Sequence, residues 1–162
     1  MKALLLSFAV LLDGREIGTH TFALKPDGVL LSKADFQVRV LGIPFYRYRH
    51  QATERWRGEC LESLVARTDD NGEKSAVDWR APGAGCELSF AYWNPRILEQ
   101  KRLLNAQTGE LEPVSVTPLG QGRYHISGRK LNVDLAYEQG RWVALETTVG
   151  GRRLRYRLES SS

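Results

Sequence analysis

The chain has 162 residues, with 23 lysines and arginines against 19 aspartates and glutamates, and a formal net charge of +4. Hydrophobic residues make up 42% and charged residues 26% of it, which is typical of a globular protein and excludes a disordered one. The length suits a single domain, residues 1–162, that can bury a core without help from a metal. The arginines are dispersed, which favours a solvated strand face over a dedicated anionic partner.

The first residues are similar to the start of a signal peptide, because Lys2 is followed by an apolar run. That run continues to Leu12 without a small-residue cleavage site. We therefore expect residues 4–12 to form the first strand and residues 1–3 to be a start or a signal remnant. The apolar run is too short to span a bilayer.

Turn residues separate period-2 apolar runs along nearly the whole chain, which predicts about ten to twelve strands in consecutive hairpins. Asp69-Asp70-Asn71-Gly72 is the strongest hairpin signal. Asn94 and Pro95 predict one short helix at 95–102, and the tail 160–162 is expected to fray. The expected strands are residues 4–12, 16–24, 29–41, 45–57, 60–68, 73–80, 86–93, 114–119, 123–127, 130–138, 141–149 and 152–159.

These elements predict an all-β fold, an antiparallel up-and-down meander. Because an open, flat edge invites aggregation, we expect so wide a sheet to curl into a barrel or half-barrel. The interior of such a curled sheet is either a packed core or a cavity. A cavity would favour a ligand-binding function.

One strand, residues 45–57, has an unusual inward face. Its odd positions are mostly arginine, so its even positions are expected to point inward: Tyr46, Tyr48, His50, Ala52, Glu54 and Trp56. Buried charge has to be paired or hydrogen-bonded. One interpretation is a satisfied Tyr–His–Glu network, or a shift in strand register that exposes Glu54. The other is that His50 and Glu54 form the polar end of an apolar ligand cavity.

The segment 90–95 is rich in aromatic residues and lies where a strand is expected to meet the helix. Tyr92 and Trp93 are interpreted either as core packing or as a lid at the mouth of a barrel.

Signatures of catalysis are weak. His20, His50 and His125 lie on three different expected strands without metal-ligand spacing, so we expect no metal and no cofactor. No nucleophile elbow is present. A hydrolase-like enzyme that uses His50 and Glu54 as a general-base pair is an alternative reading. Nucleic acid is not expected as a partner, because the arginines and aromatic residues of each strand face opposite ways.

The cysteines, Cys60 and Cys86, form neither a CxxC unit nor a zinc pattern. Their spacing leaves two options open, a disulfide or two buried free thiols. A disulfide would stabilise the fold by roughly 3–4 kcal/mol in the chain-entropy model.

Several strings, in their order along the chain, resemble a domain-of-unknown-function family of small exported bacterial proteins. They are residues 12–20, 56–58, 68–72, 89–95, 103–109 and 140–143. The resemblance implies a periplasmic or secreted location and favours a disulfide between Cys60 and Cys86. It carries no activity, and the incomplete signal peptide departs from it. The overall plan is similar to LolA-like curled-sheet carriers, by analogy of fold alone.

The leading hypothesis is therefore a non-enzymatic periplasmic binding or carrier protein for a lipid or acyl chain, with peripheral membrane contact as an option. Its expected ligand-binding residues are Tyr46, Tyr48, His50, Glu54, Trp56, Tyr92 and Trp93. A scaffold protein with a filled core and an arginine-rich docking face is a further alternative.

Overall fold

The described part of the chain contains thirteen strands, of which eleven belong to one antiparallel sheet. A computed structural model describes residues 2–129 and 131–162; Met1, the expected start, and Lys130, the expected first residue of a strand, lie outside these ranges. The strands of the first meander are β1 (Leu4–Leu12), β2 (Arg15–Leu24), β3 (Val29–Val40), β4 (Ile43–Arg57), β5 (Cys60–Asp70) and β6 (Glu73–Arg80).

A second meander follows a crossing segment. Its strands are β9 (Ser115–Gly120), β10 (Arg123–Ser127), β11 (Asn132–Glu138), β12 (Arg141–Val149) and β13 (Arg152–Ser161). The last strand pairs with the first, so the sheet order is β6-β5-β4-β3-β2-β1-β13-β12-β11-β10-β9. Ser160 and Ser161, expected to fray, pair with Ser7 and Leu6 of β1.

Residues 81–114 hold the remaining elements: the 3-10 helix η1 (Pro95–Glu99) and a small pair of strands, β7 (Arg102–Leu104) and β8 (Leu111–Pro113). The helix predicted at 95–102 is thus a short 3-10 turn and no α-helix. Asn94 caps it as expected, but Gln100 is extended and Arg102 begins β7. The strand expected at 86–93 is also absent: that segment holds a single bridge, Ser89 with Leu104.

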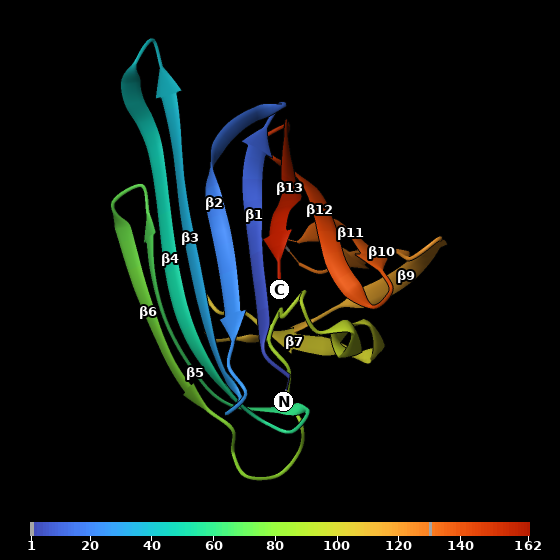
Figure 1. Cartoon of the computed structure of the whole chain (residues 1–162). Coiled ribbons are helices and arrows are strands. Elements are labelled where there is room, and N and C mark those ends of the chain that lie inside the picture. Colours follow the sequence, from blue (N-terminus) through green and yellow to red (C-terminus); the bar gives the residue numbers. More distant parts are fainter. Residues whose placement is uncertain (1, 130) are drawn as a thin grey trace.

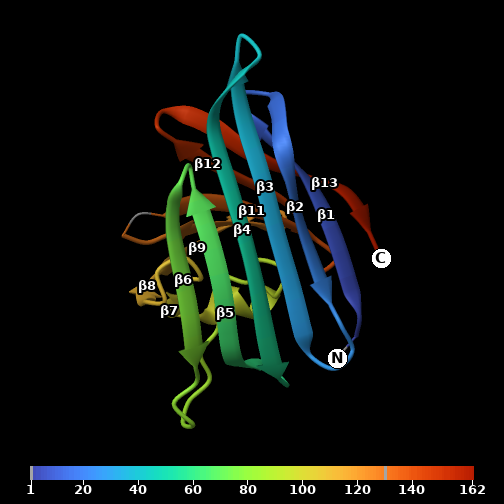
Figure 2. The same cartoon turned by 90° about the vertical axis from the view of Figure 1, so that its left-hand side faces the viewer.

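The sheet is open, so the expected barrel or half-barrel is wrong. Figure 1 shows the crossing segment against one face of the sheet, and Figure 2 shows the second meander passing behind β3–β5 at a steep angle. The crossing segment buries Leu88, Ile97, Leu103 and Leu104 in the same core as the sheet. Because this layer covers the inner face, the sheet has no need to close in order to bury it.

Both edges of the sheet carry residues that discourage pairing with another chain. The edge strand β6 has charged side chains along its length, among them Glu73, Lys74 and Asp78, and the other edge, β9, contains Pro118. The risk of aggregation at an open edge, which led us to expect closure, is thus reduced by the charged residues of β6 and by Pro118 of β9.

The core is aromatic where the two meanders meet. Trp142 is fully buried and its ring centroid lies 4.2 Å from that of Phe8 on β1. Phe22 and Tyr156 surround the same pair from β2 and β13. Large aromatic contacts of this kind hold the β1–β13 seam together.

Candidate functional site

The inward face of β4 follows the predicted alternation. Arginine, glutamine and threonine at odd positions are exposed, whereas His50, Ala52, Glu54 and Trp56 are buried. Tyr46 and Tyr48, nearer the hairpin end of the strand, are half-buried. The strand thus runs from a partly open aromatic end into a closed polar interior.

Glu54 is a buried carboxylate whose two oxygens each accept one hydrogen bond. Trp56 Nε1 donates to Oε2 and Ser89 Oγ donates to Oε1, both at 2.9 Å. Burial raises the pKa of Glu54 to about 7, and the two donors oppose that rise by favouring the charged form. Both oxygens of Glu54 are thus satisfied, but by Trp56 and Ser89 and not by the tyrosine and histidine of the expected network.

The histidines that face inward are also hydrogen-bonded. His50 Nδ1 lies 2.8 Å from Thr68 Oγ1. His20 bridges two strands, with Nδ1 2.8 Å from the hydroxyl of Tyr156 and Nε2 3.0 Å from Ser32 Oγ. Burial lowers the pKa of His50, and it lowers the pKa of His20 to about 3, so His20 is a neutral ring that fixes hydroxyl groups.

These polar groups line a small pocket of about 100 Å³ on the inward side of the sheet. Such a volume corresponds to roughly three water molecules. The interior of the sheet is therefore a packed core with a small polar pocket. Its lining includes His20, Ser32, His50, Glu54, Phe90, Tyr92, Trp93 and Tyr156.

Tyr92 and Trp93 belong to this buried layer. Trp93 stands edge-on to Trp56 at 5.2 Å, and the backbone carbonyl of Tyr92 accepts a hydrogen bond from Tyr137. Trp93 Nε1 is buried without a hydrogen-bond partner among the described residues. Both side chains thus lie on the closed interior side, together with His50 and Glu54, and Trp56 packs beside them.

A larger groove opens between the hairpin ends of the sheet. It has a volume of about 470 Å³, within the usual range of small-molecule sites. Its walls are mainly apolar and include Leu12, Ile17, Phe36, Val38, Phe45, Tyr46, Tyr48, Val149, Leu154 and Tyr156. His20 and Tyr156 line both the groove and the small pocket, so the bonded pair forms the boundary between them.

Of the residues expected to bind a ligand, the structure places two, Tyr46 and Tyr48, in the groove. Tyr46 donates a hydrogen bond to Asp70, and Tyr48 donates one to Gln107 at 3.3 Å. Burial raises the pKa of Tyr48 to about 12. Sequence reasoning missed the groove residues of β2, β3 and β13, because their proximity depends on strand pairing.

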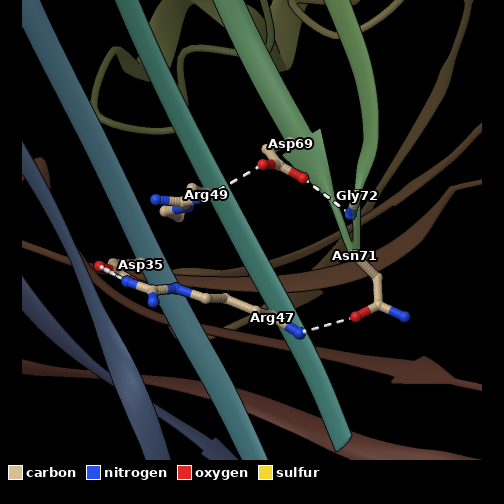
Figure 3. A network of polar contacts seen from close by, with 6 residues as sticks. All are labelled: Asp35, Arg47, Arg49, Asp69, Asn71 and Gly72. Carbon is tan, nitrogen blue, oxygen red and sulfur yellow. Dashed lines mark hydrogen bonds and ion pairs between the residues drawn. The ribbon is translucent and has the colours of Figure 1, made fainter. Parts of the chain in front are cut away.

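The outer face carries the arginines that suggested a docking surface. In Figure 3, Arg49 pairs with Asp69 at 3.1 Å and Arg47 with Asp35 at 3.4 Å. The same view shows Asp69 accepting from the Gly72 backbone and Asn71 accepting from the Arg47 backbone. Much of the positive charge on this face is thus matched within the sheet.

The two cysteines form a disulfide, Cys60–Cys86, which ties the start of β5 to the crossing segment. Disulfides persist in oxidising environments, so the pair indicates a location outside the cytoplasm. In the described part of the chain, no three His, Cys, Asp or Glu side chains gather to hold a metal ion. The helix found there, η1, is far shorter than a bilayer crossing requires.

No curated protein matches this sequence. A family match does exist, and it spans nearly all of both meanders and the crossing segment. That family is described as "Domain of unknown function (DUF6134)" and matches residues 8–159. The expected membership in a domain-of-unknown-function family is therefore confirmed, and the chain belongs to the DUF6134 family.

Proposed function

We propose that this protein is a non-enzymatic carrier that binds an apolar ligand, such as a lipid or acyl chain, in the groove between its hairpin ends. One observation carries the proposal: the groove of about 470 Å³ has aliphatic and aromatic walls and is open to solvent. A hydrocarbon chain would gain free energy by leaving water for such a surface. Its head group would stay outside.

The groove differs from the lumen that a barrel would have offered. Its floor is His20 bonded to Tyr156, and its side walls come from β1–β4, β12 and β13. The neutral His20 ring adds no charge to this floor. An uncharged, rigid floor beneath apolar walls suits a ligand whose buried part carries no charge.

The periplasm is the proposed location. The Cys60–Cys86 disulfide supports an oxidising compartment, and the apolar groove gives a reason for a soluble carrier there. The likeness to LolA-like carriers that we expected from the sequence remains part of this proposal.

Titration with a fluorescent fatty acid, cis-parinaric acid, tests the proposal directly. Val38 and Leu154 line the groove and are partly exposed, so Val38→Asn and Leu154→Asn alter its wall without opening the core. Each should weaken probe binding by roughly tenfold, because the apolar contact is lost. Val143→Asn, on a partly exposed valine outside the groove, is the matched control and should bind as the unaltered protein does.

Native mass spectrometry of the purified protein provides a second readout, since a retained lipid adds its own mass. Absence of probe binding by the unaltered protein would overturn the proposal. So would an equal loss of affinity in the Val143→Asn control, because the binding would then lie elsewhere.

A further inference from the structure

The tip of the β3–β4 hairpin is the most exposed apolar part of the molecule. The hairpin projects beyond its neighbours at one end of the sheet (Figures 1 and 2). Leu41 at its apex is 97% exposed, Ile43 68% and Val40 51%. We call these three residues, Val40, Leu41 and Ile43, the apolar tip.

The turn at the apex is chemically unusual. Val40 pairs with Ile43, so Leu41 and Gly42 form a two-residue loop, and both have positive φ, 52° and 78°. Other positive-φ residues at the first position of such loops are polar: Asp13, Asn71, Gln121 and Gln139. Asparagine and aspartate suit this conformation, whereas leucine is strained in it and gains nothing from water. An apolar contact at the apex would account for the choice of leucine.

The charges around the apolar tip are suited to an anionic surface. The segment 37–47 contains two arginines, Arg39 and Arg47, and no carboxylate. Arg15 and Arg39 have no carboxylate partner among the described ion pairs, whereas Arg47 pairs with Asp35. Arg15, Arg39 and Leu41 line one hollow of about 700 Å³ at this end of the sheet. Glu16 and the ion pair between Arg152 and Asp13 line it too, so three arginines face two carboxylates there.

We propose that the apolar tip inserts into the interface of an anionic lipid bilayer, with Arg15 and Arg39 beside the lipid phosphates. A two-residue turn reaches the boundary between head groups and acyl chains without taking the sheet into the hydrocarbon. Arginines next to an inserted apolar side chain gain from the negative surface potential. The inference rests on the apolar tip and its neighbouring arginines, and it goes beyond the proposed ligand groove.

Vesicle flotation tests the inference with the full chain. Vesicles of phosphatidylcholine mixed with phosphatidylglycerol should carry the protein upward, and vesicles of phosphatidylcholine alone should carry much less. Leu41→Asn should lower the partition coefficient by about tenfold or more, because one fully exposed leucine no longer enters the interface. Arg39→Gln should lower it by roughly fivefold, and only on the anionic vesicles.

The variants are chosen so that misfolding cannot imitate the result. Asparagine is favoured at the positive φ of position 41, so Leu41→Asn should raise Tm by roughly 2 °C while membrane binding falls. Leu119→Asn, at a 46% exposed leucine of β9, is the control and should float like the unaltered protein.

Three outcomes would overturn the inference. One is that the unaltered protein does not float with anionic vesicles, and another is that Leu41→Asn and Leu119→Asn lose vesicle binding equally. The third outcome is a dimer that Leu41→Asn dissociates, with no binding to vesicles. The last result would assign the apolar tip to a second copy of the chain. Leu41 does not line the ligand groove, so Leu41→Asn should keep its affinity for cis-parinaric acid. Failure of the tip and failure of the groove are therefore separable.

Discussion

The buried carboxyl of Glu54 makes the stability of this fold depend on pH in a direction that can be worked out. Burial raises its pKa from an ordinary value of 4.5 to about 7 in the folded protein. The folded state therefore holds the proton more tightly than the unfolded state does. The stabilisation is fully present below pH 4.5 and is lost as the pH rises through 7.

The size of the effect follows from the same two values. Each pH unit between them changes the free energy of unfolding by about 1.4 kcal/mol, so the whole interval weakens the fold by about 3 kcal/mol. For a chain of this length, that corresponds to roughly 10 °C in Tm. Glu54→Gln removes the ionisation, and its amide can still accept from Trp56 and donate to the rotated Ser89 hydroxyl.

Comparison of variant and unaltered protein is required because buried histidines act in the opposite sense. The lowered pKa values of His20 and His50 destabilise the fold as the pH falls below their ordinary value of 6.5. These contributions are common to both proteins and cancel in the difference. Thermal denaturation from pH 4 to 8 should show Glu54→Gln gaining about 3 kcal/mol relative to the unaltered protein as the pH rises.

Glu73→Gln, on the exposed edge strand β6, is the matched control and should show no such gain. Parallel stability curves for the Glu54→Gln variant and the unaltered protein would refute the reasoning. The carboxyl would then be hydrated or paired in a way that the packed interior does not allow.

Two further predictions concern covalent and steric constraints. Cys60 and Cys86 close a loop with a sequence separation of 26. The Cys60→Ser/Cys86→Ser double variant should therefore lose about 3 kcal/mol of unfolding free energy, and its Tm should not respond to reductant in a thermal scan. An unaltered protein whose Tm does not respond to reductant would contradict this. In Gly18→Ala, the new methyl group would lie 1.9 Å from the Asp35 carbonyl oxygen, so β2 and β3 must separate at a cost of about 2 kcal/mol or more, measured by denaturant unfolding. Gly128→Ala, with its nearest atom at 3.4 Å, is the control, and equal losses in the two variants would contradict the steric argument.

Local sequence signals predicted most strands well. Alternation along 45–57 placed Tyr46, His50 and Trp56 on one face, and the structure buries that face progressively from Tyr46 to Trp56. Two-residue turns such as Asn71-Gly72 set the hairpin ends. These features depend on neighbours in sequence, which is why a single chain reveals them.

Features that depend on distant pairing were not predictable in this way. Nothing local to Leu6 or Ser161 indicates that β1 and β13 lie side by side, yet this seam joins the two meanders. Residues 86–93 have strand-like composition, but they cover the sheet as irregular chain, held by the disulfide at Cys86 and the capped turn at Asn94. That layer replaces the closure we expected, so the barrel prediction failed for a tertiary reason.

The β1–β13 seam also places a hydrogen bond between the groove and the polar residues inside the sheet. His20 of β2 and Tyr156 of β13 flank β1, and their hydrogen bond lies between the groove and the small pocket that His50 and Glu54 line. Since the groove draws walls from both meanders, with Phe36 on one side and Leu154 on the other, the β1–β13 seam creates the groove and sets it above the polar residues of the core.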